Sequence, residues 1–394
     1  MAHYQYLIVG GGMTADAAIA GIRQSDSSTA IGLIGTDPHP PYDRPPLSKA
    51  LWKGQPVESI WRKTDHQGVD FHLGRTVRTV DPGEKRVTDD RGTVFTYEKL
   101  LLATGGVPRR LGFGGDQIIY YRTLDDYERL RALTQQGERF LVIGGGFIGS
   151  EVAAALAMNH KRVVMVYRDR WIGGRVFPED LARYVTDFYR RKEVEVIAED
   201  TAVGLTPQGG RYAVRTQGKQ ELTVDGIVAG LGIQPATELA EAAGLDIDNG
   251  IVVDRLLKTS HPDIFAAGDV AAFPNAALGV RTRVEHEDNA NTMGRAAGQA
   301  MAGQGGPYTH LPFFYSDLFE LGYEAVGDLD ARLETVPDWK EPYREGVIYY
   351  MKGGRVRGVL LWNTWGKVDA ARRLIADPGP FRPADLKGRL AASA

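Results

Sequence analysis

The sequence contains no cysteine among its 394 residues. Disulfides, thiolate nucleophiles, iron–sulfur clusters and thiolate metal sites all need cysteine sulfur, so this chain can build none of them. Enzymes that pass electrons through a redox-active cysteine are therefore excluded. We also predict no metal site.

The sequence also lacks a large charge excess and a long hydrophobic run. The net charge is −3 at pH 7, so no overall basic field attracts nucleic acid or anionic lipid. No apolar run is long enough to span a bilayer, and a strand predicted at residues 6–9 leaves no room for a leader. We therefore expect a cytoplasmic protein without nucleic-acid or membrane partners.

The length and composition are those of an ordinary globular protein with several domains. Apolar residues make up 43% of the chain and charged residues 25%. A chain of 394 residues is too long for one hydrophobic core, so two or three domains are expected.

Two glycine-rich turns follow apolar strands, in LIVGGGMTA (residues 7–15) and FLVIGGGFIGSEV (residues 140–152). The key positions are Gly10, Gly12 and Ala15 in the first and Gly144, Gly146 and Gly149 in the second. In such a turn the first glycine permits the sharp bend, the second lets the backbone approach a pyrophosphate, and the third lets helix pack on strand. The phosphate then lies at a helix N-terminus. Two dinucleotide sites predict electron transfer between two cofactors.

The first turn belongs to a predicted β-α-β unit over residues 4–37, with its helix at 15–24. Asp37 ends this unit, where an acid commonly meets an adenosine ribose, although a surface aspartate in a proline turn is the alternative. The proline-rich run that follows fixes an extended approach to a helix expected near Leu47. It presents Arg44 and Lys49, either to a phosphate or flavin or simply to solvent.

The second unit continues to a strand predicted at residues 162–167, after which the expected ribose-binding acid is missing. Asp169 comes slightly later, between Arg168 and Arg170, which could instead meet a 2′-phosphate. Both coenzymes remain open on these residues. We favour NADH over NADPH, because a slightly later acid can still hydrogen-bond a ribose hydroxyl, whereas arginines on a surface loop can point to solvent.

Other segments predict strands near a ligand and a further domain. Alternation over residues 68–102 is typical of antiparallel strands, and a buried strand at 260–269 ends in Asp269. A helix is expected over 281–303 with His286 in its first turn. From residue 308 onward, strands at 324–326, 347–351 and 356–361 and a helix at 367–375 predict an α+β domain, with Trp362 and Trp365 in its core.

Taken in order, these segments resemble the two-dinucleotide-binding flavoprotein superfamily, and within it the branch of oxygenase-type ferredoxin reductases and apoptosis-inducing factor. The runs that carry the resemblance are GGGMTA, PYDRPPLSK, LLATGG, GGGFIGSE and IFAAGD. RVEHEDNA and PYTHLPFFYSDLFELGYEAVG are more similar to the apoptosis-inducing factor group, so we expect a bacterial flavoprotein of that type. No death-signalling or DNA-binding role is carried over.

The resemblance implies an α/β fold like that of glutathione reductase, with two Rossmann-like domains and a C-terminal α+β domain. The implied domains are FAD-binding at residues 1–110 and 233–307, NAD(P)H-binding at 111–232, and C-terminal at 308–394. The implied FAD contacts are Gly10, Gly11, Gly12, Met13, Thr14, Asp37, Arg44, Lys49, Val77, Ala103, Thr104, Gly105, Asp269, Glu285, His286 and Tyr315. The implied coenzyme contacts are Gly144, Gly145, Gly146, Phe147, Ile148, Glu151, Asp169, Arg175, Gly232, Glu324 and Asn363.

The predicted activity is FAD-dependent NAD(P)H oxidation, with hydride passing from NADH to flavin N5 and onward to a quinone or another small acceptor. Lys49, Glu151 and His286 are the expected catalytic residues, with Lys49 and Glu151 paired beside the flavin. One alternative is a reductase for a ferredoxin or rubredoxin. Another is an NADH-responsive redox-sensing binding protein. We expect a monomer or a coenzyme-linked homodimer.

Overall fold

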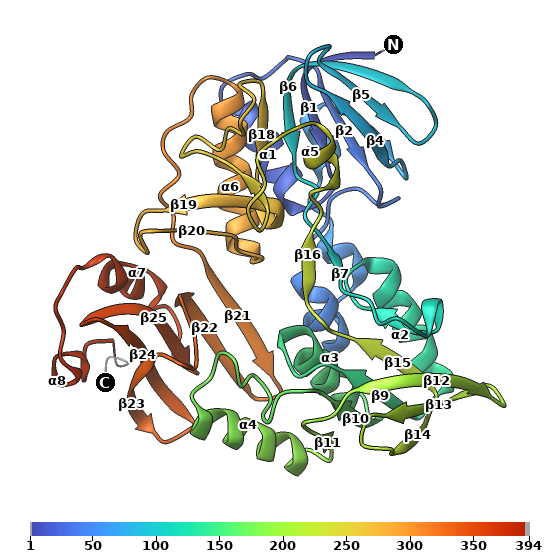
Figure 1. The fold of residues 1–394 in the computed structure, drawn as a ribbon, viewed down its shortest axis with the longest axis vertical. Helices are drawn as coiled ribbons and strands as arrows, with labels where there is room; N and C mark the ends of the chain where they lie inside the picture. Colours follow the sequence, from blue (N-terminus) through green and yellow to red (C-terminus); the bar gives the residue numbers. More distant parts are fainter. Residues whose placement is uncertain (1, 391–394) are drawn as a thin grey trace. The chain divides into compact units, whose positions relative to one another are not determined.

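The computed structural model describes residues 2–390, which form two compact units (Figure 1). Unit 1 comprises Met1–Asp43, Val57–Val107 and Gln234–Pro312, and unit 2 comprises Arg44–Pro56, Pro108–Ile233 and Phe313–Ala394. The chain passes between the units five times, after Asp43, Pro56, Val107, Ile233 and Pro312; the third crossing lies in β7 (Gly106–Pro108) and the fourth in β16 (Ile233–Pro235). Each unit is described by itself below.

Unit 1 is built on a seven-stranded sheet in the order β3-β2-β1-β6-β5-β4, with β18 paired to β6. Its strands are β1 (Ala2–Val9), β2 (Ile31–Gly35), β3 (Val69–Leu73), β4 (Val77–Asp81), β5 (Arg86–Asp89), β6 (Val94–Leu102) and β18 (Ile264–Ala266). The pairs β1–β2, β1–β6, β2–β3 and β6–β18 are parallel, whereas β4, β5 and β6 pair antiparallel. The antiparallel prediction for residues 68–102 is therefore wrong for β3, because β3 extends the parallel part of the sheet.

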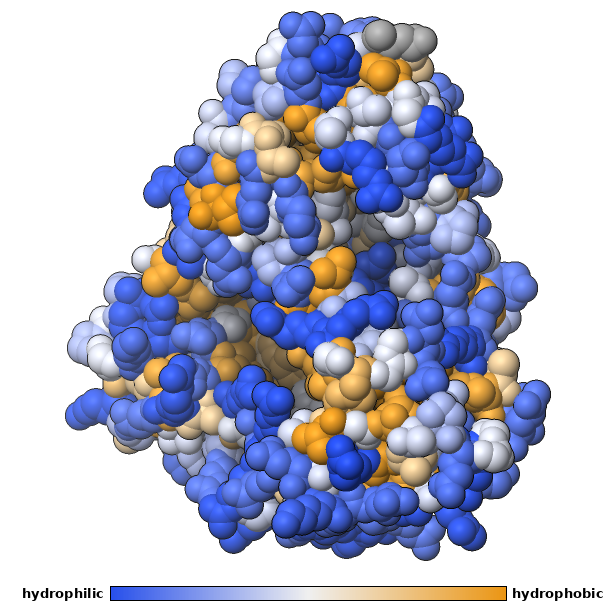
Figure 2. All heavy atoms as spheres, turned by 45° about the vertical axis from the view of Figure 1, so that its right-hand side comes forward, coloured by the Kyte–Doolittle hydropathy of each residue, from blue (hydrophilic) through white to orange (hydrophobic). Residues whose placement is uncertain are grey.

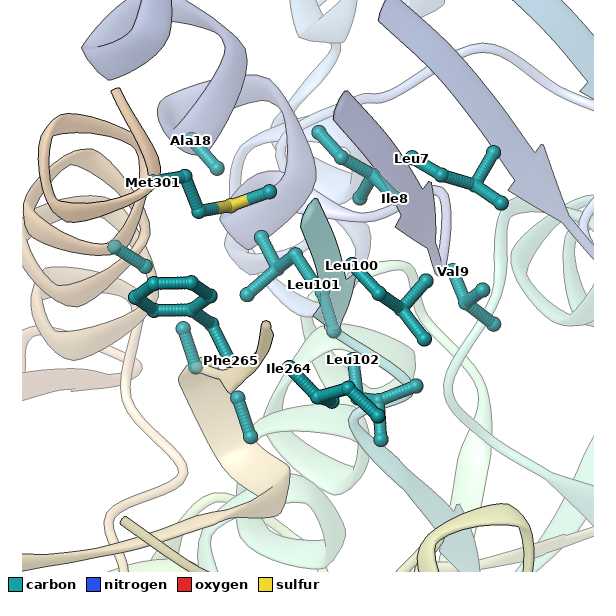
Figure 3. Packing of buried hydrophobic residues seen from close by; sticks show 14 of the residues in the cluster. Leu7, Ile8, Val9, Ala18, Leu100, Leu101, Leu102, Ile264, Phe265 and Met301 are labelled. Carbon is teal, nitrogen blue, oxygen red and sulfur yellow. The ribbon is translucent and has the colours of Figure 1, made fainter. Parts of the chain in front are cut away.

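The core of unit 1 lies between this sheet and two helices, α1 (Met13–Arg23) and α6 (Glu287–Met301). Figure 3 shows buried apolar side chains of the central strands on both faces of the sheet, because successive residues of a strand point to opposite sides: Leu7, Ile8 and Val9 of β1, Leu100, Leu101 and Leu102 of β6, and Ile264 and Phe265 of β18, with Ala18 and Met301 from the helices. Strands covered on both faces are continuously apolar, and the carboxyl ends of β1 (LIV) and β6 (LLL) have this character.

Glycines let α1 and α6 approach closely. A Cβ added at Gly298 would lie 2.0 Å from the carbonyl oxygen of Ala18, and one at Gly294 would lie 2.4 Å from that of Thr14. Conversely, a Cβ at Gly21 would lie 2.2 Å from the carbonyl oxygen of Arg295. Substitution at any of these glycines would force the helices apart.

The helix predicted over residues 281–303 begins later than expected. Residues 280–282 form β20, which pairs antiparallel with β19 (Ala271–Asn275), and β19 also pairs with β17 (Ile251–Val252). His286 is consequently the N-cap of α6 and does not lie within its first turn. A short helix, α5 (Glu238–Ala242), completes unit 1.

Unit 2 contains a second parallel sheet, in the order β11-β10-β9-β15-β8. Its strands are β8 (Ile119–Tyr120), β9 (Arg139–Ile143), β10 (Arg162–Val166), β11 (Glu195–Ile197) and β15 (Gly226–Ala229), and its helices are α2 (Leu124–Gln136), α3 (Phe147–Met158) and α4 (Glu179–Arg191). A capping box between Thr123 and Asp126 begins α2. An antiparallel meander of β12 (Ala202–Gln208), β13 (Arg211–Thr216) and β14 (Glu221–Val224) follows.

The C-terminal part of unit 2 is an antiparallel sheet in the order β21-β22-β25-β24-β23. Its elements are β21 (Phe313–Leu318), β22 (Leu321–Gly327), β23 (Glu334–Glu341), β24 (Glu345–Lys352), β25 (Arg355–Trp362), α7 (Val368–Ala376) and α8 (Pro383–Leu386). Trp362 is fully buried and stacks on Tyr323, as predicted for a core residue. Trp365, which follows β25, is 53% exposed, so its predicted place in the core is wrong. Its ring lies over Gly322 of β22.

The proline-rich segment forms two short 3-10 helices, η1 (Pro45–Ser48) and η2 (Ala50–Lys53), so the predicted helix from Leu47 is wrong. Both turns belong to unit 2, although the residues on either side belong to unit 1. The carbonyl oxygen of Leu47 accepts hydrogen bonds from Trp52 Nε1 at 2.9 Å and from the Tyr121 hydroxyl. This buried anchor fixes the break between the two turns, where Lys49 lies.

Figure 2 shows hydrophobic residues in small groups among hydrophilic ones on the face it displays. Scattered apolar residues are normal on a protein surface. Within residues 2–390, no helix has the length and apolar character needed to cross a bilayer.

Candidate functional site

The first glycine turn lies at the carboxyl edge of the parallel strands of unit 1. Gly10 has φ +120°, and a Cβ there would lie 2.1 Å from the carbonyl oxygen of Ala103, so only glycine fits. Gly12 caps α1 without any side-chain hydrogen bond. The first amide groups of α1 therefore remain available to an anion, which fits the pyrophosphate of a dinucleotide.

Two other strand ends reach the same edge as β1. Ala103 follows β6, and its amide donates to Val9 at 2.8 Å. Asp269 follows β18, and a Cβ at the preceding Gly268 would lie 2.3 Å from Thr14 Oγ1. The predicted FAD residues after β1, β6 and β18 are thus brought together where ligands bind in such sheets.

Asp37 lies two residues beyond β2 and is held by its own loop. Its Oδ1 accepts the amide of His39 at 3.1 Å, and its Oδ2 accepts the hydroxyl of Tyr42 at 2.9 Å. Each carboxylate oxygen keeps a further lone pair, so Asp37 retains capacity for a ribose hydroxyl. Val77 is a buried residue of β4.

His286 and Glu285 precede α6. Burial lowers the pKa of His286 to about 4, while the nearby carboxylates of Asp269 and Asp288 act in the opposite direction. The imidazole is therefore neutral at pH 7. Glu285 forms an ion pair with Arg283 at 2.7 Å.

The second glycine turn repeats the first in unit 2. Gly144 has φ +118°, and a Cβ there would lie 2.3 Å from the carbonyl oxygen of Gly230; a Cβ at Gly149 would lie 2.1 Å from that of Gly144. A Cβ at Gly146 would meet nothing within 4 Å, and this residue caps α3 without a side-chain hydrogen bond. The turn thus leaves space and amide donors for a second pyrophosphate. Phe147, next in the chain, is 36% exposed.

Asp169 follows β10 and pairs with Arg175, with 3.2 Å between Asp169 Oδ2 and Arg175 Nε. Arg170 pairs with Glu179 at 3.2 Å. Arg168 is exposed. Asp169 and Arg175, both predicted for the coenzyme site, are thus neighbours. Of the two arginines considered for a 2′-phosphate, Arg170 is paired with a carboxylate.

The predicted ion pair between Lys49 and Glu151 is confirmed. Lys49 Nζ donates to Glu151 Oε2 at 2.7 Å, and the two side chains are 10% and 3% exposed. The Lys49 ammonium also lies 5.3 Å from the ring centre of Tyr315. A lysine, a carboxylate and an aromatic ring from three distant segments therefore form one cluster in unit 2.

Two serines in this cluster were not predicted. Ser48 Oγ donates to Glu151 Oε2 at 2.5 Å, and Ser316 Oγ donates to Glu151 Oε1 at 2.6 Å. Ser48 stands in the proline-rich run beside Lys49, so its position was a weak signal in the sequence. Ser316 gave none, because it lies in β21, a strand that was not predicted, and nothing in the sequence links it to α3.

The remaining predicted coenzyme residues of unit 2 differ in their surroundings. Within the described chain, Glu324 Oε2 is buried and has no hydrogen-bond partner, and burial raises the pKa of this carboxyl group. Gly232 has φ +78° and open space on its Cβ side. Both ends of the Asn363 side-chain amide are bonded to backbone groups. Its Oδ1 accepts from the Gly322 amide at 2.7 Å, and its Nδ2 donates to the Arg344 carbonyl at 2.7 Å.

The predicted site residues divide between the units. Unit 1 holds Gly10, Gly11, Gly12, Met13, Thr14, Asp37, Val77, Ala103, Thr104, Gly105, Asp269, Glu285 and His286. Unit 2 holds Arg44, Lys49, Gly144, Gly145, Gly146, Phe147, Ile148, Glu151, Asp169, Arg175, Gly232, Tyr315, Glu324 and Asn363. Their individual contacts with cofactors stay predictions. Among residues 2–390, no group of three or more histidine or acidic side chains is arranged to hold a metal ion.

Comparison with known proteins shows what this arrangement is similar to. Residues 4–294 match the family described as pyridine nucleotide-disulphide oxidoreductase. Residues 297–342 and 337–377 match the family described as apoptosis-inducing factor, mitochondrion-associated, C-term. These matches confirm the predicted fold class and the predicted branch.

Individual relatives carry names from the same two groups, apoptosis-inducing factors and ferredoxin-type reductases. Apoptosis-inducing factor 1, mitochondrial, of Dictyostelium discoideum is 33% identical, over 94% of this chain and 78% of its own. The 5,5'-dehydrodivanillate O-demethylase ferredoxin reductase subunit of a Sphingobium species is 33% identical, over 96% of this chain and 94% of its own. Among solved structures, the covalent putidaredoxin reductase–putidaredoxin complex matches with a TM-score of 0.89 and 29% identity, covering 98% of this chain and 95% of the other.

Proposed function

Because this chain belongs to the pyridine nucleotide-disulphide oxidoreductase family, we propose that it oxidises NADH through a bound FAD and passes the electrons to an external acceptor. The observation that carries the proposal is the pair of glycine turns. Gly10 and Gly144 each leave no room for a Cβ, and each precedes a helix whose N-cap makes no side-chain hydrogen bond. One turn in each unit accounts for two dinucleotides.

FAD, when bound, supplies the hydride-accepting ring and the release of electrons, so the protein's part is binding, orientation and electrostatics. In unit 2, the buried ammonium of Lys49 is the group that would support negative charge on a reduced ring bound beside it. In unit 1, the neutral imidazole of His286 offers a hydrogen-bonding group without a positive charge. The proposed domains are residues 1–110 with 233–307 for FAD, 111–232 for the coenzyme, and 308–394 at the C-terminus.

The preferred coenzyme in this proposal is NADH. Asp169, beside Arg175, offers carboxylate oxygens to ribose hydroxyls, whereas a 2′-phosphate would be repelled by that charge. Stopped-flow reduction of the flavin by each coenzyme tests this choice, and a tenfold preference for NADPH would contradict it.

The acceptor in this proposal is a quinone or another small molecule. A ferredoxin-type partner is the second candidate, favoured by the names of two relatives, a ferredoxin reductase subunit and putidaredoxin reductase. Steady-state turnover with quinones and with a ferredoxin from the same organism separates them. Fast, salt-sensitive reduction of the ferredoxin would replace the small acceptor, since such docking is electrostatically steered. Slow turnover with every acceptor would favour the redox-sensing alternative.

The proposal also includes a cytoplasmic location and a monomer or a homodimer that forms with reduced coenzyme. Gel filtration of the yellow protein with and without NADH measures this directly. A dimer that is equally stable without coenzyme would contradict the linkage.

A further inference from the structure

We propose that Ser316, on the C-terminal sheet, is a positioning residue for hydride transfer, which together with Ser48 fixes the carboxylate of Glu151 and through it the ammonium of Lys49. This inference rests on the proposed function, because it assumes that the ion pair serves a flavin. It gives the C-terminal sheet a part in the chemistry of the enzyme.

The carboxylate of Glu151 is enclosed by donors on both oxygens. Oε2 accepts from Lys49 Nζ at 2.7 Å and from Ser48 Oγ at 2.5 Å, and Oε1 accepts from Ser316 Oγ at 2.6 Å. Glu151, Ser48 and Ser316 are all buried. Hydrogen bonds to an ionised group are the strong ones, and two bonds on different oxygens prevent the carboxylate from rotating.

The direction of the hydrogen bonds follows from the chemistry of the groups. An ionised carboxylate only accepts, so the single proton of Ser316 must point to Glu151. Tyr323 is hydrogen-bonded to Ser316, and burial holds the pKa of this phenol well above 10, so it keeps its proton. Tyr323 therefore donates to Ser316, and Ser316 donates to Glu151. The buried tyrosine sets the orientation of the serine hydroxyl.

Three segments that are far apart in the sequence meet at this carboxylate. Lys49 and Ser48 come from the paired 3-10 turns, Glu151 from α3, and Ser316 from β21. Lysine is a flexible side chain whose charge has no preferred direction of its own. Its ammonium is placed by the acceptor it meets, and that acceptor is placed by the two serines.

The expected effect of losing Ser316 differs from that of a merely structural change. Without its hydroxyl, Glu151 can rotate and the Lys49 ammonium can move with it, which weakens the support for negative charge on a reduced ring. The limiting rate of flavin reduction should then fall, and the midpoint potential of the bound flavin should become more negative. NADH binding should be unaffected, because no donor of the glycine turn is lost.

The test uses the FAD-loaded full chain with Ser316→Ala, Ser48→Ala and Tyr323→Phe. The control is Thr364→Val, which removes a buried hydroxyl that binds only the carbonyls of Gly346 and Trp362. Stopped-flow spectroscopy gives the limiting rate and the apparent Kd for NADH, and spectroelectrochemistry gives the midpoint potential. Tyr323→Phe tests the inference without touching a group bonded directly to Glu151.

Ser316→Ala should slow the limiting rate about tenfold and shift the potential, with Tyr323→Phe in the same direction and Thr364→Val like the natural protein. If Ser316→Ala and Ser48→Ala leave both rate and potential unchanged while Lys49→Ala slows reduction, the positioning role is overturned and the proposed function stands. If no natural or variant protein is reduced by NADH, the proposed function itself fails.

Discussion

Replacing Lys49 by methionine is the perturbation that most directly tests the ion pair in unit 2. The change keeps an unbranched chain of similar length and removes the ammonium that lies 2.7 Å from Glu151. Both side chains are nearly buried, so the carboxylate loses its counter-ion in a place where water cannot replace it. Breaking a buried pair in this way costs about 3 kcal/mol, toward the low end of the usual range because both serines remain as donors.

The loss should be visible as a lower Tm. For domains of this size 1 kcal/mol corresponds to roughly 2–4 °C, so Lys49→Met should lower the Tm by roughly 6–12 °C. The limiting rate of flavin reduction should fall in parallel, because the cation that supports negative charge on the ring is gone. Differential scanning calorimetry and stopped-flow spectroscopy of the FAD-loaded protein measure the two effects.

A second variant separates the two effects. Lys49→Met combined with Glu151→Gln removes both charges, so no unpaired charge stays buried and most of the Tm should return. Flavin reduction should remain slow, because the cation is still missing. A Lys49→Met protein with unchanged Tm and unchanged reduction rate would refute the whole argument.

Three further predictions concern the glycine turn of unit 2, the coenzyme acid and the histidine before α6. Gly144→Ala should lower both the Tm and the affinity for NADH, because its Cβ has no room beside the Gly230 carbonyl. Gly146→Ala, whose Cβ meets nothing within 4 Å, should lower only the affinity. Calorimetry measures the Tm and NADH titration measures the affinity, and equal losses of Tm in the two variants would contradict this prediction. Asp169→Asn should raise the KM for NADH about tenfold and that for NADPH less, in steady-state assays with ferricyanide. The pKa of His286 is about 4 in the folded protein against an ordinary value of 6.5, so between these values the unfolded chain binds more protons than the folded one. The free energy of unfolding therefore falls as the pH is lowered from 6.5 toward 4. His286→Gln should flatten this part of the curve of Tm against pH.

The sequence predicted the parts of the fold that are written locally. Each glycine turn carries its own strand, bend and helix in about fifteen residues, and both formed as expected. The error at residues 281–303 arose because RTRVEHED (residues 281–288) leads into the helix with no proline or glycine to mark a boundary, and only the pairing of β20 with β19 shows that the helix begins at Glu287. β3 was assigned the wrong direction because alternation within a strand says nothing about its partner.

The candidate site was predictable where a sequence motif carries its residues and not where a residue lies outside every motif. Lys49 and Glu151 were paired from their motifs although 102 residues separate them. Ser316 lies 165 residues from Glu151, on a strand whose presence the sequence analysis missed. Asn363 shows the opposite case, since a residue assigned to coenzyme by resemblance has both ends of its amide engaged by backbone groups.

The absence of cysteine gives the cluster around Glu151 its meaning within this family. An enzyme with a redox-active cysteine pair holds a second redox centre in its own chain. Here the chain has no cysteine, so the electrons must leave from the flavin itself. In the proposed function the same ring accepts hydride and then meets the acceptor, so a charge held beside that ring would act on both steps. A cation fixed there would favour hydride transfer to the ring and reduce the driving force for electron transfer to the acceptor, so Ser48 and Ser316, which hold the carboxylate that pairs with Lys49, would influence both steps of the proposed reaction.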